Sequence, residues 1–269
     1  SPGRLVPAEG GLAFVPAPLP DELALDARAA TLLGEAEHTM GRLVGTTAGM
    51  VNPYLVASPL LHREALLSSR IEGTYATPEQ LVLLDLQPAG DEAAGGQRED
   101  TREVHNYIRA MEHGLASPLP LSLRLIREVH RVLLDGVRGN RARPGEFRRL
   151  QNFIGRPGDT LATARYVPPP PSEMRACLDV LERRLHRERE GLPVLVKVAL
   201  VHYQFEAVHP FLDGNGRVGR LLIPLMLARS GRLPQPVLYM SAYLERHRER
   251  YMDLLLEVSR RGAWLEWAA

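Results

Sequence analysis

The sequence contains a single cysteine, Cys177, among its 269 residues, which excludes a disulfide framework or a zinc site built from several thiolates within the chain. It has no apolar run that approaches the roughly 18 residues of a membrane-spanning helix. The N-terminal segment 1–5 also lacks the apolar stretch of a signal peptide. We therefore expect a cytoplasmic protein that does not enter a membrane, with Cys177 as a buried apolar residue.

An excess of charge of either sign is also missing. The 33 Lys and Arg residues nearly balance the 32 Asp and Glu residues, which gives a net charge of +1 with neutral histidine. This balance gives no reason to expect nucleic acid or an anionic membrane as a partner. The hydrophobic share of 45% is ordinary for a globular protein and is large enough to form a buried core.

Helical periodicity dominates the sequence, and no internal repeat is present. We predict a mainly α fold with helices over 21–43, 58–73, from 77, 99–114, 122–134, 172–190, 193–208 (with one core-facing side), 216–231 and 241–262. Residues 1–20 are expected to form an extended arm, and 147–155 is expected to pair with 161–167 as one short β-hairpin. The loose polar stretch 87–97 is the candidate boundary between an N-terminal helical region (1–95) and a core (96–269).

The densest group of functional residue types lies in residues 209–220, with the sequence HPFLDGNGRVGR. Gly214 and Gly216 allow backbone N–H groups to converge in a tight loop. A predicted helix follows, and its N-terminus carries a positive partial charge that favours anions. Arg217 and Arg220 add two cations near that end. The combination suits a polyphosphate ligand.

Three further residues of this segment have chemistry of their own. Asp213 offers a hard oxygen ligand, and magnesium commonly binds through one carboxylate together with substrate phosphates. His209 lies at the mouth of the loop and is a candidate general base, because its ordinary pKa of roughly 6.5 leaves it neutral near physiological pH. Asn215 adds a side-chain amide to the same loop.

Other interpretations of these patterns fit less well. Gly214, Gly216 and Gly219 match the glycine positions of a dinucleotide-binding turn, but that turn requires a preceding strand, and the preceding segment has helical periodicity. A P-loop is excluded because the Gly-Lys-Ser/Thr of that motif is missing. A glycine-rich corner between packed helices would not explain the accompanying His, Asp, Asn and Arg residues. His202 and Glu206 lie four residues apart, but without a third ligand we expect them to have a structural role.

Residues 209–220 resemble the signature of the Fic family, His-x-Phe-x-Asp/Glu-Gly-Asn-Gly-Arg-x-x-Arg, at every fixed position. The resemblance extends to residues 13–20, AFVPAPLP, and to residues 64–74, EALLSSRIEGT. The latter contains Ser68-x-x-x-Glu72-Gly73, which is similar to the family's inhibitory motif. The chain is thus identified as a member whose inhibitory helix precedes the catalytic core. The fold that this implies is a Fic-type helical bundle with a β-hairpin flap.

The resemblance implies transfer of AMP from ATP to a Ser, Thr or Tyr hydroxyl of a target protein and of the enzyme itself. His209 would accept the hydroxyl proton, and Asp213 would hold Mg²⁺ against the phosphates. The residues that would bind the nucleotide are Gly214, Asn215, Gly216, Arg217, Val218, Gly219, Arg220 and Tyr251. Glu72 would pair with Arg220 and keep it from the γ-phosphate, and Ser68, on the same helix face, would fix the inhibitory helix.

The resemblance also assigns a flap, in which Asn152, Phe153, Ile154 and Gly155 would hold the target segment. Tyr251 takes the place of the first residue of an adenine-stacking tyrosine pair, and Met252 replaces the second, so the nucleotide preference stays open. Three alternatives remain: another nucleotide donor, removal of AMP from a modified target, and a nucleotide-binding regulator that is not an enzyme. A homodimer is compatible with the resemblance. Neither DNA binding nor the winged-helix domain common in the family is expected in this chain.

Overall fold

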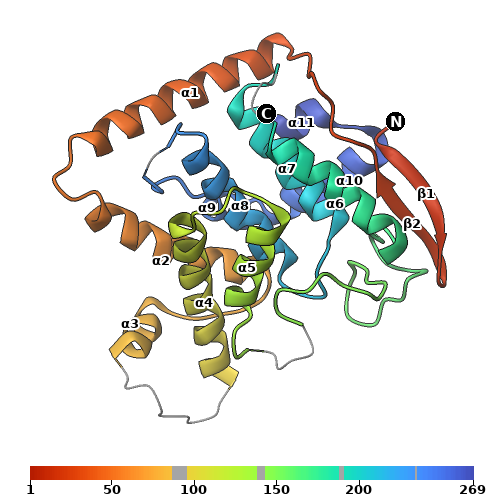
Figure 1. Cartoon of the computed structure of the whole chain (residues 1–269), viewed down its shortest axis with the longest axis horizontal. Coiled ribbons are helices and arrows are strands. Elements are labelled where there is room, and N and C mark those ends of the chain that lie inside the picture. The colour runs from red at the N-terminus through yellow and green to blue at the C-terminus, as the bar shows by residue number, and fades with distance from the viewer. Residues whose placement is uncertain (87–95, 138–142, 188–190, 234) are drawn as a thin grey trace.

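Two helices that are joined by a short loop form the centre of the fold, as the computed structural model shows (Figure 1). The structure describes residues 1–86, 96–137, 143–187, 191–233 and 235–269. Its strands are β1 (Gly3–Ala8) and β2 (Gly11–Pro16), and its helices are α1 (Ala27–Ala48), α2 (Tyr54–Ile71), α3 (Pro78–Leu86), α4 (Gly96–Ala116), α5 (Leu123–Leu133), α6 (Pro171–Leu185), α7 (Val194–Val208), α8 (Asn215–Arg229), α9 (Ser241–Arg246), α10 (Arg248–Arg261) and α11 (Trp264–Ala268). The prediction of a mainly helical fold is confirmed.

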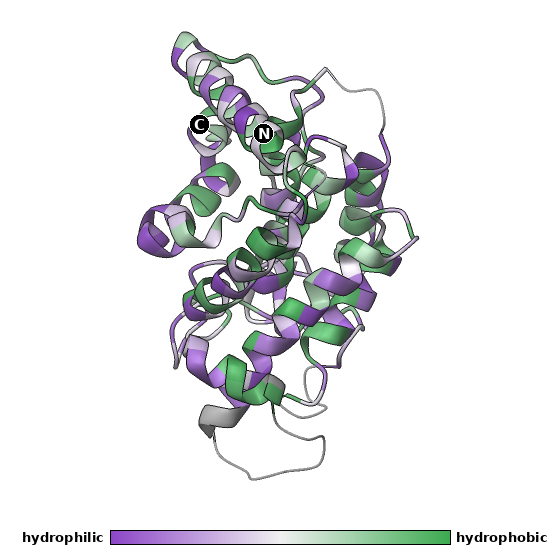
Figure 2. Ribbon diagram, turned by 90° about the vertical axis from the view of Figure 1, so that its left-hand side faces the viewer, coloured by the Kyte–Doolittle hydropathy of each residue, from purple (hydrophilic) through white to green (hydrophobic). Residues whose placement is uncertain are grey.

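The central pair is α7 and α8. Every residue of α7 from 200 to 208 is buried, so the prediction of one core-facing side is wrong for this half of the helix. The reason is that α6, α8, α10 and α11 all pack against α7. Peripheral helices differ, since only Ala29, Met40 and Thr47 are buried in α1. Figure 2 shows the mixed hydrophilic and hydrophobic banding along the helices.

No helix in the described part of the chain combines the length and apolar character needed to cross a membrane.

The N-terminal arm is a β-hairpin. Strands β1 and β2 pair antiparallel from Gly3 opposite Pro16 to Ala8 opposite Gly11. By contrast, the hairpin predicted over 147–167 is reduced to one bridge, between Ile154 and Tyr166. Proline has no backbone N–H, and the segment around this bridge holds Pro157 and a run of four prolines at 168–171, which limits a regular ladder.

Several helix boundaries differ from the predicted ones. Helix α1 begins after Asp26, whose Oδ1 accepts the N–H of Ala29 at 2.7 Å, whereas Asp21 pairs instead with Arg184 and Arg187 of the α6 region. Helix α2 begins before the predicted Ser58 cap and contains Pro59 in its interior. The helix predicted over 241–262 is divided at His247 into α9 and α10. The predicted domain boundary at 87–97 falls largely on residues 87–95, outside the described residues.

A capping box forms at the start of α3, the helix predicted to begin at 77. The N–H of Thr77 donates to Gln80 Oε1 at 2.8 Å, and the N–H of Gln80 donates to Thr77 Oγ1 at 3.3 Å. The two side chains therefore satisfy backbone donors that the first helical turn leaves without partners.

Replacing Thr77 by alanine is expected to lower the free energy of unfolding by about 1 kcal/mol, because the cap is lost. For a protein of this size the melting temperature should fall by about 2–4 °C. Thermal unfolding of Thr77→Ala and of the control Thr31→Ala, an exposed threonine inside α1, measures the difference. Equal losses in the two variants would show that the capping box contributes nothing specific.

Candidate active site

The loop between α7 and α8 is closed by its own side chains. Helix α7 ends at His209, whose left-handed backbone (φ 48°) turns the chain out of the helix. Phe211 is fully buried, and its backbone N–H and carbonyl both bond the amide of Asn215, each at 2.9 Å. Asn215, predicted to bind nucleotide, therefore also holds the loop in shape.

His130 of α5 supports this loop, a role that sequence reasoning missed because nothing near His130 in the chain marks it. Its ring stacks on Phe211 with 3.7 Å between ring centroids. The N–H of Gly145 donates to its Nδ1 at 2.8 Å, so the proton lies on Nε2, which donates to the carbonyl of Asp213 at 3.0 Å. Burial lowers the pKa of His130 to about 4, which keeps it in this neutral form.

The N-terminus of α8 faces Glu72. Gly214 caps the helix in a left-handed conformation (φ 77°), and Asp213 Oδ1 accepts the Gly214 N–H at 2.6 Å. A Cβ atom at Gly216 would lie 2.1 Å from Glu72 Oε1. Only glycine at this position leaves room for a carboxylate, or for an anion of similar size, against the first turn of α8.

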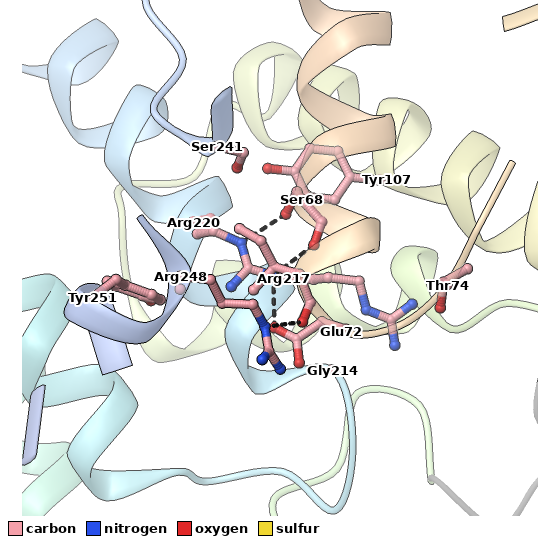
Figure 3. A network of polar contacts seen from close by, with 12 residues as sticks. Ser68, Glu72, Thr74, Tyr107, Gly214, Arg217, Arg220, Ser241, Arg248 and Tyr251 are labelled. Carbon is pink, nitrogen blue, oxygen red and sulfur yellow. Dashed lines mark hydrogen bonds and ion pairs between the residues drawn. The ribbon is translucent and has the colours of Figure 1, made fainter. Parts of the chain in front are cut away.

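Glu72 and Arg220 form the ion pair that the resemblance implies. Arg220 Nη2 donates to Glu72 Oε1 at 2.7 Å, and the same guanidinium donates to the hydroxyl and carbonyl of Ser68 at 2.8 and 2.9 Å (Figure 3). Arg220 is 1% exposed, whereas the Glu72 side chain is 32% exposed. Burial opposes ionisation of Glu72 and is the largest single effect, but the charge and hydrogen bond of Arg220, together with the charge of Arg217, lower the pKa of Glu72. Both groups are therefore ionised at neutral pH.

Helix α2, which ends just before Glu72, is fixed by polar contacts. Glu64 accepts hydrogen bonds from the Ser241 hydroxyl at 2.6 Å, the Ser241 N–H at 3.0 Å and the Tyr107 hydroxyl at 3.1 Å. At its other end, the carbonyl of Ile71 accepts from Arg248 Nε at 3.0 Å. Helix α2 is thus joined to α4, to α9 and to the start of α10. Sequence reasoning identified none of these partners.

Arg217 is engaged differently from Arg220. It is 1% exposed and donates from Nη1 to Glu103 Oε2 at 2.6 Å, while its Nη2 lies 3.6 Å from Asp213 Oδ1. Figure 3 shows its side chain directed away from Tyr251, toward Thr74. The two arginines that were predicted to bind phosphate therefore have different partners. Arg217 bonds Glu103 of α4, and Arg220 bonds Ser68 of α2.

A cavity of about 730 Å³ brings seven of the sixteen predicted site residues together. Its wall includes Glu72, Ile154, Gly155, His209, Gly216, Arg220 and Tyr251. It does not include the other predicted residues Ser68, Asn152, Phe153, Asp213, Gly214, Asn215, Arg217, Val218 and Gly219. Val218 is fully buried in the core. Arg248 and Glu206 are among the further wall residues that the prediction of the site omitted.

His209 has the protonation state that a base requires. Burial, and then the charge of Arg148, lower its pKa to about 4. Its Nδ1 lies 3.3 Å from the carbonyl of Glu206, an acceptor, so Nδ1 carries the proton. Nε2 is then the basic nitrogen, and it is neutral throughout the physiological pH range.

Tyr251 is held in the cavity wall by two aromatic residues. The Nδ1 proton of His202 is donated to the carbonyl of Gly219 at 2.9 Å, so the Tyr251 hydroxyl donates to His202 Nε2, also at 2.9 Å. Trp267 of α11 stacks on both rings, with centroids 5.9 Å from His202 and 6.0 Å from Tyr251. The expected structural role of His202 is therefore to orient Tyr251. Stacking of Tyr251 on a base stays a prediction.

The predicted flap lies beside the motif loop. Ile154 exchanges two backbone hydrogen bonds with Tyr166, at 2.8 and 3.0 Å. Asn152 Nδ2 donates to the carbonyl of Phe211 at 3.0 Å, which ties the segment to the loop. Phe153 is 39% exposed.

Asp213 could contribute to a magnesium site, although the described residues contain no group of three His, Cys, Asp or Glu side chains that could hold a metal ion. Its side chain is 32% exposed at the N-terminus of α8. Magnesium that is bound through one carboxylate takes its remaining ligands from phosphates and water. The donor set therefore fits a metal ion that arrives with a polyphosphate.

Taken together, these features define a mainly helical protein in which a helix N-terminus, the carboxylate that faces it and a neutral histidine line one cavity. Two family models match the chain, Fic/DOC family N-terminal over residues 30–116 and Fic/DOC family over residues 120–227. The chain belongs to the Fic/DOC family.

Relatives and solved structures agree with this assignment. The proteins named protein adenylyltransferase Fic of Drosophila grimshawi and Drosophila melanogaster are 33% and 31% identical to the chain over 172 residues, 61% of it. The chain spans about a third (32%) of the length of these curated relatives. The crystal structure of a Fic family protein from Desulfovibrio desulfuricans G20 has a TM-score of 0.73 at 22% identity, covering 91% of this chain and 72% of that chain. A Fic domain containing signaling protein from Bacteroides thetaiotaomicron has a TM-score of 0.67 at 21% identity, covering 86% and 89%.

Proposed function

We propose that the chain transfers AMP from ATP to a hydroxyl group of a protein, including its own, and that Glu72 holds this activity in an inhibited state. The observation that carries the proposal is the shared cavity, in which His209 and the Glu72–Arg220 pair face the same space. The likeness to proteins named protein adenylyltransferase Fic supports ATP as the donor.

The reaction follows from the positions of the side chains. The α-phosphate of ATP lies against the α8 N-terminus at Gly216, with its negative charge stabilised there. Nε2 of His209 accepts the proton of the target hydroxyl as its oxygen bonds to the α-phosphorus. The bond between the α- and β-phosphates breaks, and pyrophosphate leaves. Magnesium, when bound at Asp213, neutralises charge on the phosphates.

Inhibition follows from competition for one cation. Arg220 Nη1 is buried without a hydrogen-bond partner among the described residues, while Nη2 is occupied by Glu72. A γ-phosphate needs this guanidinium and the space that Glu72 fills. ATP therefore binds productively only when the Glu72 carboxylate moves away.

Label position tests the reaction. In a Glu72→Gly background, ATP labelled on the α-phosphate should label the protein, and ATP labelled on the γ-phosphate should not. Adding His209→Ala should lower the rate about 10²- to 10⁴-fold, which is the usual contribution of a positioned base. Transfer of the γ-label would indicate a kinase reaction, and an unaffected His209→Ala variant would exclude His209 as the base. Intact mass should rise by one AMP per modified hydroxyl.

A further inference from the structure

Glu206 lines the same cavity but takes no part in the transfer described above. It lies on α7, three residues before His209, and is only 8% exposed. Its Oε1 atom is buried and has no hydrogen-bond partner among the described residues. A buried carboxylate without a donor is costly, so this carboxyl group must either carry a proton or meet a ligand that supplies what the protein does not.

Glu206 and Glu72 both lie against α8, at neighbouring positions. A Cβ atom at Gly219 would lie 2.1 Å from Glu206 Oε1, just as one at Gly216 would lie 2.1 Å from Glu72 Oε1. These two glycines are three residues apart, and residues at this spacing are neighbours on one helix face, with Cβ positions about 5–6 Å apart. The two carboxyl groups therefore lie against α8 at two neighbouring glycines, where no side chain fills the space.

The ionisable groups near the Glu206 carboxyl come from four elements. Glu72 follows α2, His202 lies on α7, Arg220 on α8 and Tyr251 on α10. His209 lines the same cavity. The His202 and Tyr251 side chains bond each other, so neither supplies a donor to Glu206. Burial raises the pKa of Glu206 to about 8, with Arg220 lowering it and Glu72 raising it. Burial is the largest of these effects, so Glu206 keeps its proton at neutral pH.

We propose that Glu206 binds the outer phosphates of the nucleotide, donating a hydrogen bond from its neutral carboxyl group to a phosphate oxygen that takes the place of the Glu72 carboxylate. The inference rests on the proposed function, because it needs a nucleoside triphosphate in this cavity. Arg220 Nη1 supplies a second donor to the same phosphate. When Glu206 loses its proton, it becomes an anion beside the phosphate, so it repels the ligand instead of binding it.

The test is nucleotide binding measured by calorimetry at pH 7 and pH 9, in a Glu72→Gly background. Glu206 loses its proton as the pH rises, so ATP affinity should fall between pH 7 and pH 9. AMP, which has no outer phosphates, should bind with little pH dependence. A Glu72→Gly/Glu206→Gln variant should bind ATP equally at both pH values, because the amide stays neutral.

Each other outcome has a definite meaning. The same loss of ATP affinity with and without Glu206→Gln, or an equal loss for AMP and ATP, would overturn the role of Glu206 and leave the proposed function standing. Failure of the Glu72→Gly variant to bind ATP at pH 7 would overturn both. Should Glu206→Gln not fold, the comparison of AMP with ATP in the Glu72→Gly variant alone decides the question.

Discussion

Replacing Glu72 by glycine is expected to raise the rate of AMP transfer about 10- to 150-fold at fixed ATP and magnesium. Hydrogen bonds to charged groups contribute about 1.5–3 kcal/mol, and each 1.4 kcal/mol corresponds to a factor of ten. The Glu72–Arg220 bond is of this kind, at 2.7 Å and with a buried guanidinium. Its loss returns Arg220 to the phosphates. Initial rates with α-labelled ATP measure the effect.

Two substitutions of Glu72 separate the effect of its charge from the effect of its size. Glu72→Gln retains the shape of the side chain but loses its charge, so its rate should lie between those of the wild type and of Glu72→Gly. Glu35→Gln, which removes an exposed acid on α1 far from the cavity in sequence, is the matched control and should leave the rate unchanged. A rate in Glu72→Gly no higher than in the wild type would contradict the inhibitory role.

Replacing Arg148 by alanine is expected to lower the free energy of unfolding by about 3–5 kcal/mol, as the loss of other buried charged partners does. Arg148 is 2% exposed, and its guanidinium bonds the carbonyls of Val208, His209, Leu150 and Pro169 at 2.5–3.4 Å. Burial lowers its pKa to about 10, which still leaves it charged at neutral pH. Alanine would leave these carbonyls without their donor.

Thermal unfolding measures this prediction. At about 2–4 °C per kcal/mol, the melting temperature of Arg148→Ala should fall by about 6–20 °C. Its neighbour Arg149 is exposed, so Arg149→Ala is the control and should change the melting temperature by less than about 2 °C. Because Arg148 holds the end of α7, the remaining folded protein should also transfer AMP more slowly. Similar melting temperatures for the two variants would contradict the argument.

The loop of the candidate site could be predicted because its residues are contiguous. The order of His209, Asp213 and Arg220 along the chain already fixes which elements carry them, and short-range rules place the glycines and the helix start. The capping box at Thr77 was predictable for the same reason, since its partners are three residues apart. The Glu72–Arg220 pair spans 148 positions and was found only through the resemblance to a known motif.

The missed residues have distant partners and no local motif. Arg148 lies 61 positions from His209, Glu103 lies 114 from Arg217, and Glu64 lies 177 from Ser241. A charged side chain in a helical pattern is normally predicted to face solvent, and only the packed fold shows that these are buried. The misplaced hairpin has a different cause. Strands were predicted at 147–155 and 161–167, but the neighbouring prolines limit a regular ladder and a single bridge remains.

The short helix α11 gives the protein an optical probe of its own. Both tryptophans of the chain, Trp264 and Trp267, lie in this helix. Trp267 stacks on Tyr251, which lines the cavity, and its Nε1 donates to the carbonyl of Ala199 at 2.7 Å, so the indole is held in place. A base that stacks on Tyr251 changes the surroundings of this indole. The intrinsic fluorescence of the unlabelled protein can therefore follow filling and emptying of the cavity in real time.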